Sequence, residues 1–335
     1  MKKIINDPKS IVNEMAQGIC LAYPQYVTQV ALPEKGQAII ARSKKKTGKV
    51  ALVSGGGSGH EPSHAGYVGE GMLDAAVCGA VFTSPTPDAV FEAIKAVKTD
   101  KGVLLVIKNY TGDVMNFEMA MELAEAEGIK TAKVITCDDV AVMNSTYTVG
   151  RRGIAGTVFV HKIAGAAAEA GLDLAAVQKI GEKVIANTRS MGIALTPCIV
   201  PEAGKPGFTL ADDELEIGLG IHGEPGVVRG KIKKADELTA EILAKILADN
   251  PIKQGDEVAL LVNGLGGTPL MELFVINRAA HEILKGNGAK VLWTNVGNYM
   301  TAIEMAGFSL SVLKLDAELK KFLDAKADTP AFKVV

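Results

Sequence analysis

The chain has 335 residues, of which 48% are hydrophobic and 22% charged, and its formal net charge is −2 at pH 7. This near-neutral balance argues against binding to nucleic acid or to an anionic membrane surface. The start, MKKIINDPKS, lacks the apolar core of a signal peptide, and no run approaches the roughly 18 apolar residues of a membrane span. We therefore expect a cytoplasmic protein of two domains, each able to bury its own core.

The first half of the chain alternates strand and helix patterns. Three short β-branched runs, typical of strands covered on both faces, lie at 49–54, 102–108 and 132–136. The stretch 84–97 predicts a helix with Thr86 as its N-cap and Pro87 at its first position. The stretch 116–128 predicts a second amphipathic helix that ends at a glycine. This order predicts a largely parallel sheet with helices on its faces.

The second half resumes the strand pattern after a long helical stretch from about 155 to 187, which is interrupted at 170–174. Strands are expected at 192–201, 214–223, 256–264, 289–295 and 308–316, and helices at 237–249 and 271–285. We place the boundary near residue 188, which gives an N-terminal α/β domain at 1–188 and a C-terminal α/β domain at 189–335. The expected fold class is α/β, with two domains of mixed, largely parallel sheets flanked by helices.

The stretch SGGGSGHEP (54–62) follows the first predicted strand and resembles a phosphate loop without being one. A P-loop needs a Gly-Lys-Ser/Thr ending, and a dinucleotide loop needs a third glycine where His60 and Pro62 stand. A second glycine stretch, NGLGGTP (263–269), has a proline in the last place of the same pattern. Two interpretations remain: a tight turn whose glycines allow close packing, or a loop that lets a small ligand approach backbone N–H groups beside His60.

Two further stretches carry side chains suited to chemistry. KNYTGDVMNF (108–117) lies at the carboxyl end of a predicted strand, where open parallel sheets bind ligands. Asp113 is there either a general acid or base or the N-cap of the next helix, and Lys108 is either a ligand contact or a solvent-facing strand end. In GIHGEPG (220–226), glycines leave room around His222, which can attack a carbonyl carbon, although a lone histidine also fits a packed or surface position.

The remaining histidines and the cysteines suggest no further site. His64, His161 and His281 lie in helical or polar contexts, so we interpret them as structural. The four cysteines are far apart, mostly in apolar surroundings, which is typical of thiols in a reducing compartment. No spacing of cysteine and histidine matches a zinc site, and we expect no metal on the chain.

Taken together with FTSPTPD (82–88), GRRG (150–153) and AGKPGFTLADDE (203–214), these stretches resemble the substrate-binding K subunit of dihydroxyacetone kinase. The resemblance runs in order over almost the whole chain. It implies a homodimer whose His222 adds through Nε2 to the ketone of dihydroxyacetone, forming a covalent hemiaminal. It also implies acid–base roles for Asp113 and His60, and a substrate contact for Lys108. The residues that it assigns to holding the substrate in the glycine stretch are Gly57, Ser58, Gly59 and His60.

The resemblance also bears on cofactors and partners. Members that use ATP directly carry a second, nucleotide-binding helical domain, which this sequence does not show. The resemblance is therefore to the phosphoenolpyruvate-dependent type, in which a separate L subunit holds ADP or ATP with magnesium and an M protein of the phosphotransferase system rephosphorylates it. No cofactor is then expected on this chain. Two alternatives stay open: a dihydroxyacetone-binding paralogue that acts as a transcriptional co-regulator, and a nucleotide-binding α/β enzyme, which both glycine stretches disfavour.

Overall fold

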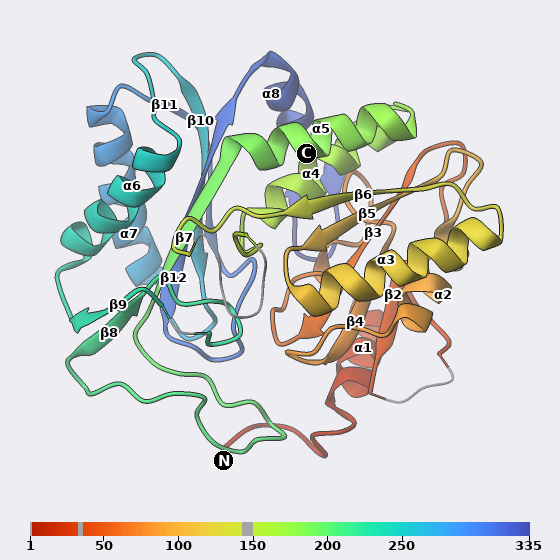
Figure 1. Cartoon of the computed structure of the whole chain (residues 1–335), viewed down its shortest axis with the longest axis horizontal. Helices are drawn as coiled ribbons and strands as arrows, with labels where there is room; N and C mark the ends of the chain where they lie inside the picture. The colour runs from red at the N-terminus through yellow and green to blue at the C-terminus, as the bar shows by residue number, and fades with distance from the viewer. Residues whose placement is uncertain (1, 33–35, 143–149, 225) are drawn as a thin grey trace.

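The computed structural model describes residues 2–32, 36–142, 150–224 and 226–335. Within these ranges the chain forms two six-stranded sheets with helices packed against them (Figure 1). The expected α/β class with two helix-flanked sheets is confirmed. Pro225, part of the GIHGEPG stretch, lies outside the described residues.

The first sheet has the strand order β1-β2-β4-β3-β5-β6. Its strands are β1 (Val27–Val30), β2 (Ala38–Arg42), β3 (Ala51–Ser58), β4 (Ala75–Val81), β5 (Val103–Lys108) and β6 (Thr131–Thr136). Strands β4, β3, β5 and β6 are parallel, as the alternation of strands and helices predicts, and β1 and β2 add antiparallel pairings. Helices α2 (Pro87–Val97) and α3 (Thr111–Ala126) cover one face, and α1 (Ile11–Ala22) packs on the other.

The second sheet has the order β11-β10-β12-β7-β8-β9. Its strands are β7 (Thr188–Ala194), β8 (Glu214–Ile217), β9 (Val228–Lys231), β10 (Glu257–Gly264), β11 (Lys290–Gly297) and β12 (Gly307–Leu315). Among its described pairings only β10–β11 is parallel, so the expectation of a largely parallel sheet is wrong for this half. The reason is connectivity, because loops rather than crossover helices join β7 to β8 and β8 to β9.

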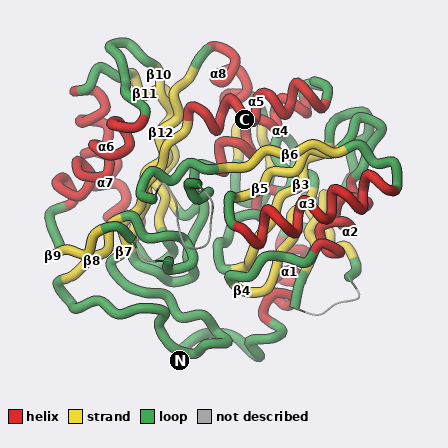
Figure 2. Tube along the Cα trace, viewed as in Figure 1, coloured by secondary structure: helices red, strands yellow, loops and turns green. Residues whose placement is uncertain are grey.

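The helices form layers around the two sheets. Helices α4 (Thr157–Glu169) and α5 (Leu174–Asn187) lie between the sheets and share one apolar core with both (Figure 2). Helices α6 (Ala235–Asp249) and α7 (Leu270–Gly286) cover the far face of the second sheet. The C-terminal α8 (Ala317–Asp324), β13 (Ala327–Asp328) and β14 (Lys333–Val334) return to the first half, where α8 packs on α4. A short 3-10 turn, η1 (Ala65–Tyr67), follows the glycine stretch.

Local signals set several element ends correctly and others only approximately. Thr86 caps α2 by accepting a hydrogen bond from the Ala89 N–H, with Pro87 at the first helical position, as predicted. The interruption at 170–174 separates α4 from α5. Helix α3 begins at Thr111, five residues before the predicted start, and the strands predicted at 192–201 and 214–223 end at Ala194 and Ile217. The division into domains at residue 188 falls between α5 and β7 and stays a prediction.

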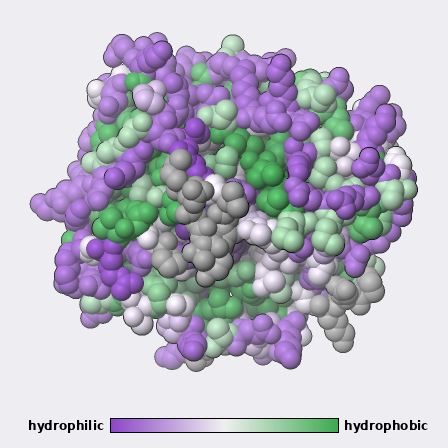
Figure 3. All heavy atoms as spheres, viewed as in Figure 1, coloured by the Kyte–Doolittle hydropathy of each residue, from purple (hydrophilic) through white to green (hydrophobic). Residues whose placement is uncertain are grey.

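The surface agrees with the balanced composition. Figure 3 shows a face on which hydrophilic side chains predominate and apolar ones gather toward the middle. Among the described helices, none is both long enough and apolar enough to cross a bilayer.

Candidate active site

A cavity of about 1020 Å³ lies where the two halves of the chain meet. Its walls combine the carboxyl ends of β3 and β4, the start of α3 and the segments around β8 and β9. Residues on the side of the first sheet include Gly57, Phe82, Thr83, Ser84, Tyr110 and Asp113. Residues from the second half include Phe208, Glu216, His222, Glu224 and Arg229. The strand-end position is the one that parallel sheets use for ligands.

The glycines of the first stretch allow close approach within the wall of this cavity. Strand β3 continues through Ser58, so most of the expected loop is the end of a strand. A Cβ atom on Gly56 would lie 2.2 Å from the Lys108 Nζ, and one on Gly57 would lie 2.5 Å from the backbone nitrogen of Thr83. Both are far below a normal contact, so these positions need glycine. Gly57 also lines the cavity, so the packing and ligand-approach interpretations are compatible.

The polar groups of Ser58 and Gly59 form internal hydrogen bonds and do not line the cavity. The Ser58 hydroxyl donates to the Gly79 carbonyl at 2.7 Å, and the Gly59 N–H donates to the Glu61 carboxylate at 3.1 Å. Neither residue is part of the cavity lining described above. The structure therefore brings Gly57, but not the polar groups of the next two residues, to the predicted ligand position.

His222 and His60 meet at the cavity through their Nε2 atoms, which lie 3.0 Å apart. The His60 ring is fully buried, and its Nδ1 donates to the Thr301 carbonyl at 2.7 Å. The His222 side chain keeps 19% exposure, so a ligand can reach it. Burial, with His222 and Lys108 nearby, lowers the pKa of His60 well below its ordinary value. The sequence prediction that these two histidines belong to one site agrees with their geometry.

Glu224 orients His222 and was not singled out in the sequence. One carboxylate oxygen accepts from the His222 Nδ1 at 2.9 Å, and the other accepts from its main-chain N–H at 2.9 Å. Burial alone would raise the pKa of Glu224, but the His222 ring and the nearby Arg152 outweigh burial and lower it to about 2. Glu224 is therefore an ionised acceptor, and its position two residues after a glycine-flanked histidine was the available signal.

These partners fix where the protons of the histidine pair lie. In each ring Nδ1 donates, since the Thr301 carbonyl and the Glu224 carboxylate can only accept. Two neutral rings would then face each other with two bare Nε2 lone pairs. The two Nε2 atoms, 3.0 Å apart, are therefore the acceptor positions of the pair.

Arg152, from the GRRG stretch, supports the segment that carries His222 and Glu224. It is completely buried, and its guanidinium donates to the Asp139 carboxylate and to the Gly218 carbonyl at 2.7 Å. Gly218 precedes the turn that carries His222 and Glu224. Burial raises the pKa of Asp139 to about 6, even though Arg152 opposes this shift. Arg152 thus connects the segment that precedes α4 to the segment that carries His222.

Lys108 and Asp113 form a buried ion pair at the opposite wall. The Lys108 Nζ lies 3.3 Å from the Asp113 Oδ2, and its side chain has no exposed surface. Asp113 stands in the first turn of α3, whose N-cap residue is Tyr110, so the N-cap interpretation of Asp113 is wrong. The solvent-facing interpretation of Lys108 is also wrong. Asp113 lines the cavity, whereas Lys108 lies behind it.

The second glycine stretch supports His60 and leaves no room for a phosphate. The Asn263 side chain forms hydrogen bonds with the main chain of Tyr299 and Met300. The next residue, Thr301, provides the carbonyl that accepts from the His60 Nδ1. A Cβ atom on Gly266 would lie 2.0 Å from the Ile303 carbonyl oxygen. These glycines therefore serve close packing.

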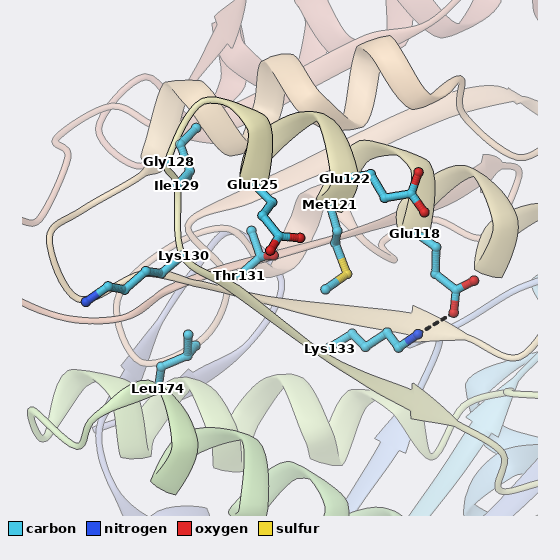
Figure 4. A pocket seen from close by; sticks show the side chains of 10 residues that line it. All are labelled: Glu118, Met121, Glu122, Glu125, Gly128, Ile129, Lys130, Thr131, Lys133 and Leu174. Carbon is cyan, nitrogen blue, oxygen red and sulfur yellow. Dashed lines mark hydrogen bonds and ion pairs between the residues drawn. The ribbon is translucent and has the colours of Figure 1, made fainter.

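Another cavity, of about 820 Å³, lies between α3 and the start of α5, near the amino end of β6 and away from the histidines (Figure 4). Its polar lining consists of glutamates from α3 and lysines around β6, and Lys133 pairs with Glu118. No histidine or cysteine is among its lining residues. This arrangement of surface charges offers no group for covalent or acid–base chemistry comparable to the histidine pair.

The fold and the site define an α/β protein with a strand-end cavity, a paired histidine and an ion-paired aspartate. The chain belongs to the Dak1 family, whose domain model matches residues 17–331. The resemblance to dihydroxyacetone kinase K subunits is thereby confirmed.

Three relatives illustrate the family. The chain is 55% identical over 318 residues, 95% of each chain, to the dihydroxyacetone-binding subunit DhaK of PTS-dependent dihydroxyacetone kinase 1 from Listeria innocua. The dihydroxyacetone kinase of C. freundii, solved with AMP-PNP and Mg²⁺, is 35% identical with a TM-score of 0.92, and the match covers 99% of this chain and 61% of the kinase. The operon co-activator Dha-DhaQ is 36% identical with a TM-score of 0.89, over 97% and 98% of the two chains. The first two relatives are thus named as kinases or their subunits, which are phosphotransferases.

Proposed function

We propose that this chain is the dihydroxyacetone-binding subunit of a phosphoenolpyruvate-dependent dihydroxyacetone kinase, and that it carries the ketone as a covalent hemiaminal on the His222 Nε2. The observation that carries the proposal is the Nε2–Nε2 contact of His222 and His60 at the cavity, with Glu224 on the other side of the reactive ring. The relationship over 95% of the Listeria subunit supports the same assignment.

The tautomers of the histidine pair suit this addition. With its proton on Nδ1, His222 has a free lone pair on Nε2 that attacks the carbonyl carbon. The carbonyl π electrons move to oxygen as the C–N bond forms, and that oxygen takes a proton from solvent, which the His60 Nε2 relays. The product is a hydroxyl on carbon and a substituted imidazolium, whose charge the Glu224 carboxylate balances. Glycerol has no carbonyl and cannot form this bond.

The next step requires a base at a hydroxyl of the bound triose. Asp113 lines the same cavity and lies beside the Lys108 ammonium, so we assign it the proton of the attacking hydroxyl. Covalent attachment fixes the hydroxyl relative to this carboxylate, which supplies orientation as well as affinity.

The phosphoryl donor is assigned to a partner protein. The glycine stretches in the described structure do not fit a nucleotide, because the Gly59 N–H is bonded to Glu61 and Gly266 packs against Ile303. We propose that ADP or ATP with magnesium is held by a separate L subunit and replenished by an M protein of the phosphotransferase system. A homodimer and a cytoplasmic location belong to the same proposal.

The second candidate is a dihydroxyacetone-binding co-regulator of transcription. The similarity to Dha-DhaQ over nearly the full length of both chains favours it. Both candidates bind the ketone, and they differ in turnover. Phosphorylation of dihydroxyacetone on mixing with an L subunit and its M protein supports the kinase, and its absence with several such partners supports the co-regulator.

Intact-protein mass spectrometry tests the covalent step. Under non-denaturing conditions the unaltered chain should gain the mass of one dihydroxyacetone and gain nothing from glycerol. His222→Ala should gain nothing while keeping its circular dichroism spectrum, and His281→Ala, on α7, serves as the matched control. An adduct on His222→Ala would contradict the assignment.

A further inference from the structure

A row of buried polar groups continues from the cavity wall into the first half of the chain. It runs from Asp113 through Lys108 and His64 to His161, and each side chain is almost completely buried. Lys108 Nζ lies 3.3 Å from the His64 Nε2, and the His64 Nδ1 lies 2.9 Å from the His161 Nε2. The sequence assigned both histidines to ordinary structural positions, and the function described so far uses neither.

Lys108 stands at the centre of this row with its donors fully occupied. An ammonium has three N–H donors and no acceptor. Its three neighbours are the Gly55 carbonyl at 3.2 Å, the Asp113 carboxylate at 3.3 Å and the His64 Nε2 at 3.3 Å. His64 is therefore the third anchor of the ammonium group. Without it, one buried N–H would lack a partner and the lysine would be free to turn.

The row also fixes the tautomer of each histidine. The His64 Nε2 accepts from Lys108, so the His64 proton lies on Nδ1 and is donated to the His161 Nε2. The proton of His161 then lies on its Nδ1, which has no hydrogen-bond partner among the described residues. A row that ends on an N–H without an acceptor cannot pass a proton onward, so it serves to orient groups rather than to conduct protons.

Burial keeps both rings neutral. It lowers the pKa of His64 well below its ordinary value and that of His161 to about 3, and the charge of Lys108 adds to both shifts. At neutral pH the row therefore has one arrangement of donors and acceptors.

We propose that His64, held in one tautomer by His161, is a positioning residue that fixes the Lys108 ammonium and, through it, the Asp113 carboxylate at the cavity. This inference rests on the proposed role of Asp113 as the base for the triose hydroxyl. It separates two functions within the site: the histidine pair at the cavity binds the ketone, and the buried row orients the base for the second step.

Paired substitutions at His64 test the inference. His64→Leu removes the acceptor, whereas His64→Gln places an amide oxygen near the position of Nε2. In the reconstituted reaction, His64→Leu should lower kcat by about 10- to 100-fold, the range expected for a misplaced group, with the yield of the His222 adduct unchanged. His64→Gln should recover most of kcat. His281→Leu, a histidine that bonds Thr294 on the second half, is the control.

The adduct measurement distinguishes failure of this inference from failure of the proposed function. If the unaltered chain forms no adduct, the proposed function is wrong. If it forms the adduct and turns over, and His64→Leu has the same kcat, the positioning role is wrong. Equal loss in the Leu and Gln variants also contradicts it, because a lost acceptor should be restored by the amide.

A spectroscopic measurement on the unaltered chain avoids any effect of substitutions on folding. Nitrogen-15 NMR of the histidine rings reports which nitrogen carries the proton. We expect His64 and His161 both to be neutral and protonated on Nδ1 at pH 7. A proton on the Nε2 of His64 overturns the proposal, since that nitrogen could then no longer accept from Lys108.

Discussion

Glu224 holds His222 by both its ring and its main chain, so the His222 ring has little freedom to turn. An ionised carboxylate can only accept, which keeps the ring proton on Nδ1 and leaves Nε2 for chemistry. A glutamine in this place could donate instead and favour the opposite tautomer. The charge of Glu224, and not only its shape, therefore matters to the site.

The first prediction concerns Asp113, whose roles in binding and in proton transfer can be separated. Asp113→Asn keeps the size of the side chain but removes the base. We expect the His222 adduct to form as in the unaltered chain and turnover in the reconstituted system to fall by about 10²- to 10⁴-fold. Asp88→Asn, on the exposed start of α2, should change neither quantity. Near-normal turnover of Asp113→Asn would show that its carboxylate is structural.

At this scale the sequence indicated candidate groups more readily than their partners. His222 was singled out because glycines flank it, His60 because it follows a glycine stretch, and Asp113 because it follows a predicted strand end. Their contacts join distant parts of the chain: His60 and His222 are separated by 162 positions, and His64 and His161 by 97. Local patterns cannot report such pairings, which is why Arg152 and the buried histidines were not assigned to the site, whereas Glu224 lies two residues after His222 and carried a local signal.

At the scale of elements, Gly266 of the second glycine stretch differs from Gly18 of α1 in what surrounds it. Gly266 has φ +115° and meets the Ile303 carbonyl, whereas Gly18 in α1 has nothing within 4 Å of a Cβ position. In the sequence, both positions are simply glycines, and nothing beside them indicates which one is tightly packed. Only the fold distinguishes a position that requires glycine from one that tolerates a side chain.

The second prediction uses this contrast. Gly266→Ala forces a Cβ against backbone and should destabilise the protein by about 2–4 kcal/mol. Gly18→Ala removes backbone freedom from a helix interior and should stabilise it by about 0.5–1 kcal/mol. Chemical denaturation measures both. If Gly266→Ala is neutral, the stretch around it is not the tightly packed support of His60 described above.

Helices α4 and α8 are joined by a buried lysine whose titration affects stability. The Lys162 Nζ donates to the Phe322 carbonyl at 2.6 Å. Burial lowers the pKa of Lys162 from 10.5 to about 8, and Asp324 opposes this only in part. Between pH 8 and 10.5 the unfolded chain binds a proton that the folded chain does not, so stability rises with pH across this window.

The third prediction follows from this rise of stability with pH. The stabilising effect of the depressed pKa is present above the unfolded value of 10.5 and is lost as the pH falls through about 8. Relative to Lys162→Met, the unfolding free energy of the unaltered chain should therefore increase by roughly 3 kcal/mol from pH 7 to above pH 10. Denaturation curves of both proteins at the two pH values measure the difference. The exposed Lys98→Met should show no such change, and a pH-independent difference for Lys162 contradicts the argument.

The two sheets show how far element patterns determine a fold. In the first half, the pattern predicted β3, β5 and β6 together with α2 and α3, which favours parallel pairing, but it did not predict β1, β2 or β4. In the second half, β12 inserts between β10 and β7, and loops connect β7, β8 and β9. Strand order there depends on which edges meet after the chain has folded. The sequence pattern predicted strands overlapping β7, β8, β10, β11 and β12, but not β9, and it did not indicate which strands are neighbours.

At the scale of the whole molecule, the cavity is built from both halves and opens to solvent beside His222 and Asp113. Under the proposed function, a phosphoryl donor bound by another protein must reach this opening. The one cationic residue in the described lining is Arg229, which pairs with Glu216. A single surface arginine is a small part of the cation and metal arrangement that phosphoryl transfer requires.

The fourth prediction is that the isolated protein binds neither ATP nor ADP, with or without magnesium. Both glycine stretches are occupied by internal contacts, as shown for Gly59 and Gly266. Isothermal calorimetry of the purified chain against Mg-ATP should give no stoichiometric heat, while the same protein forms the dihydroxyacetone adduct. Phosphorylation of dihydroxyacetone by this chain with ATP alone would show that the division of labour between subunits is wrong.

The return of the C-terminal segment to the first half has a consequence for how the molecule comes apart. Phe322 and Phe332 belong to the same apolar core as Tyr67 and Phe159, although β7 to β12 lie between them in the sequence. A fragment that stops after α5 would expose that core, so we expect that the first half does not fold on its own. Limited proteolysis should consequently leave clipped pieces associated rather than release a stable half, and unfolding should be one cooperative transition in which the histidine-lined cavity and the core are lost together.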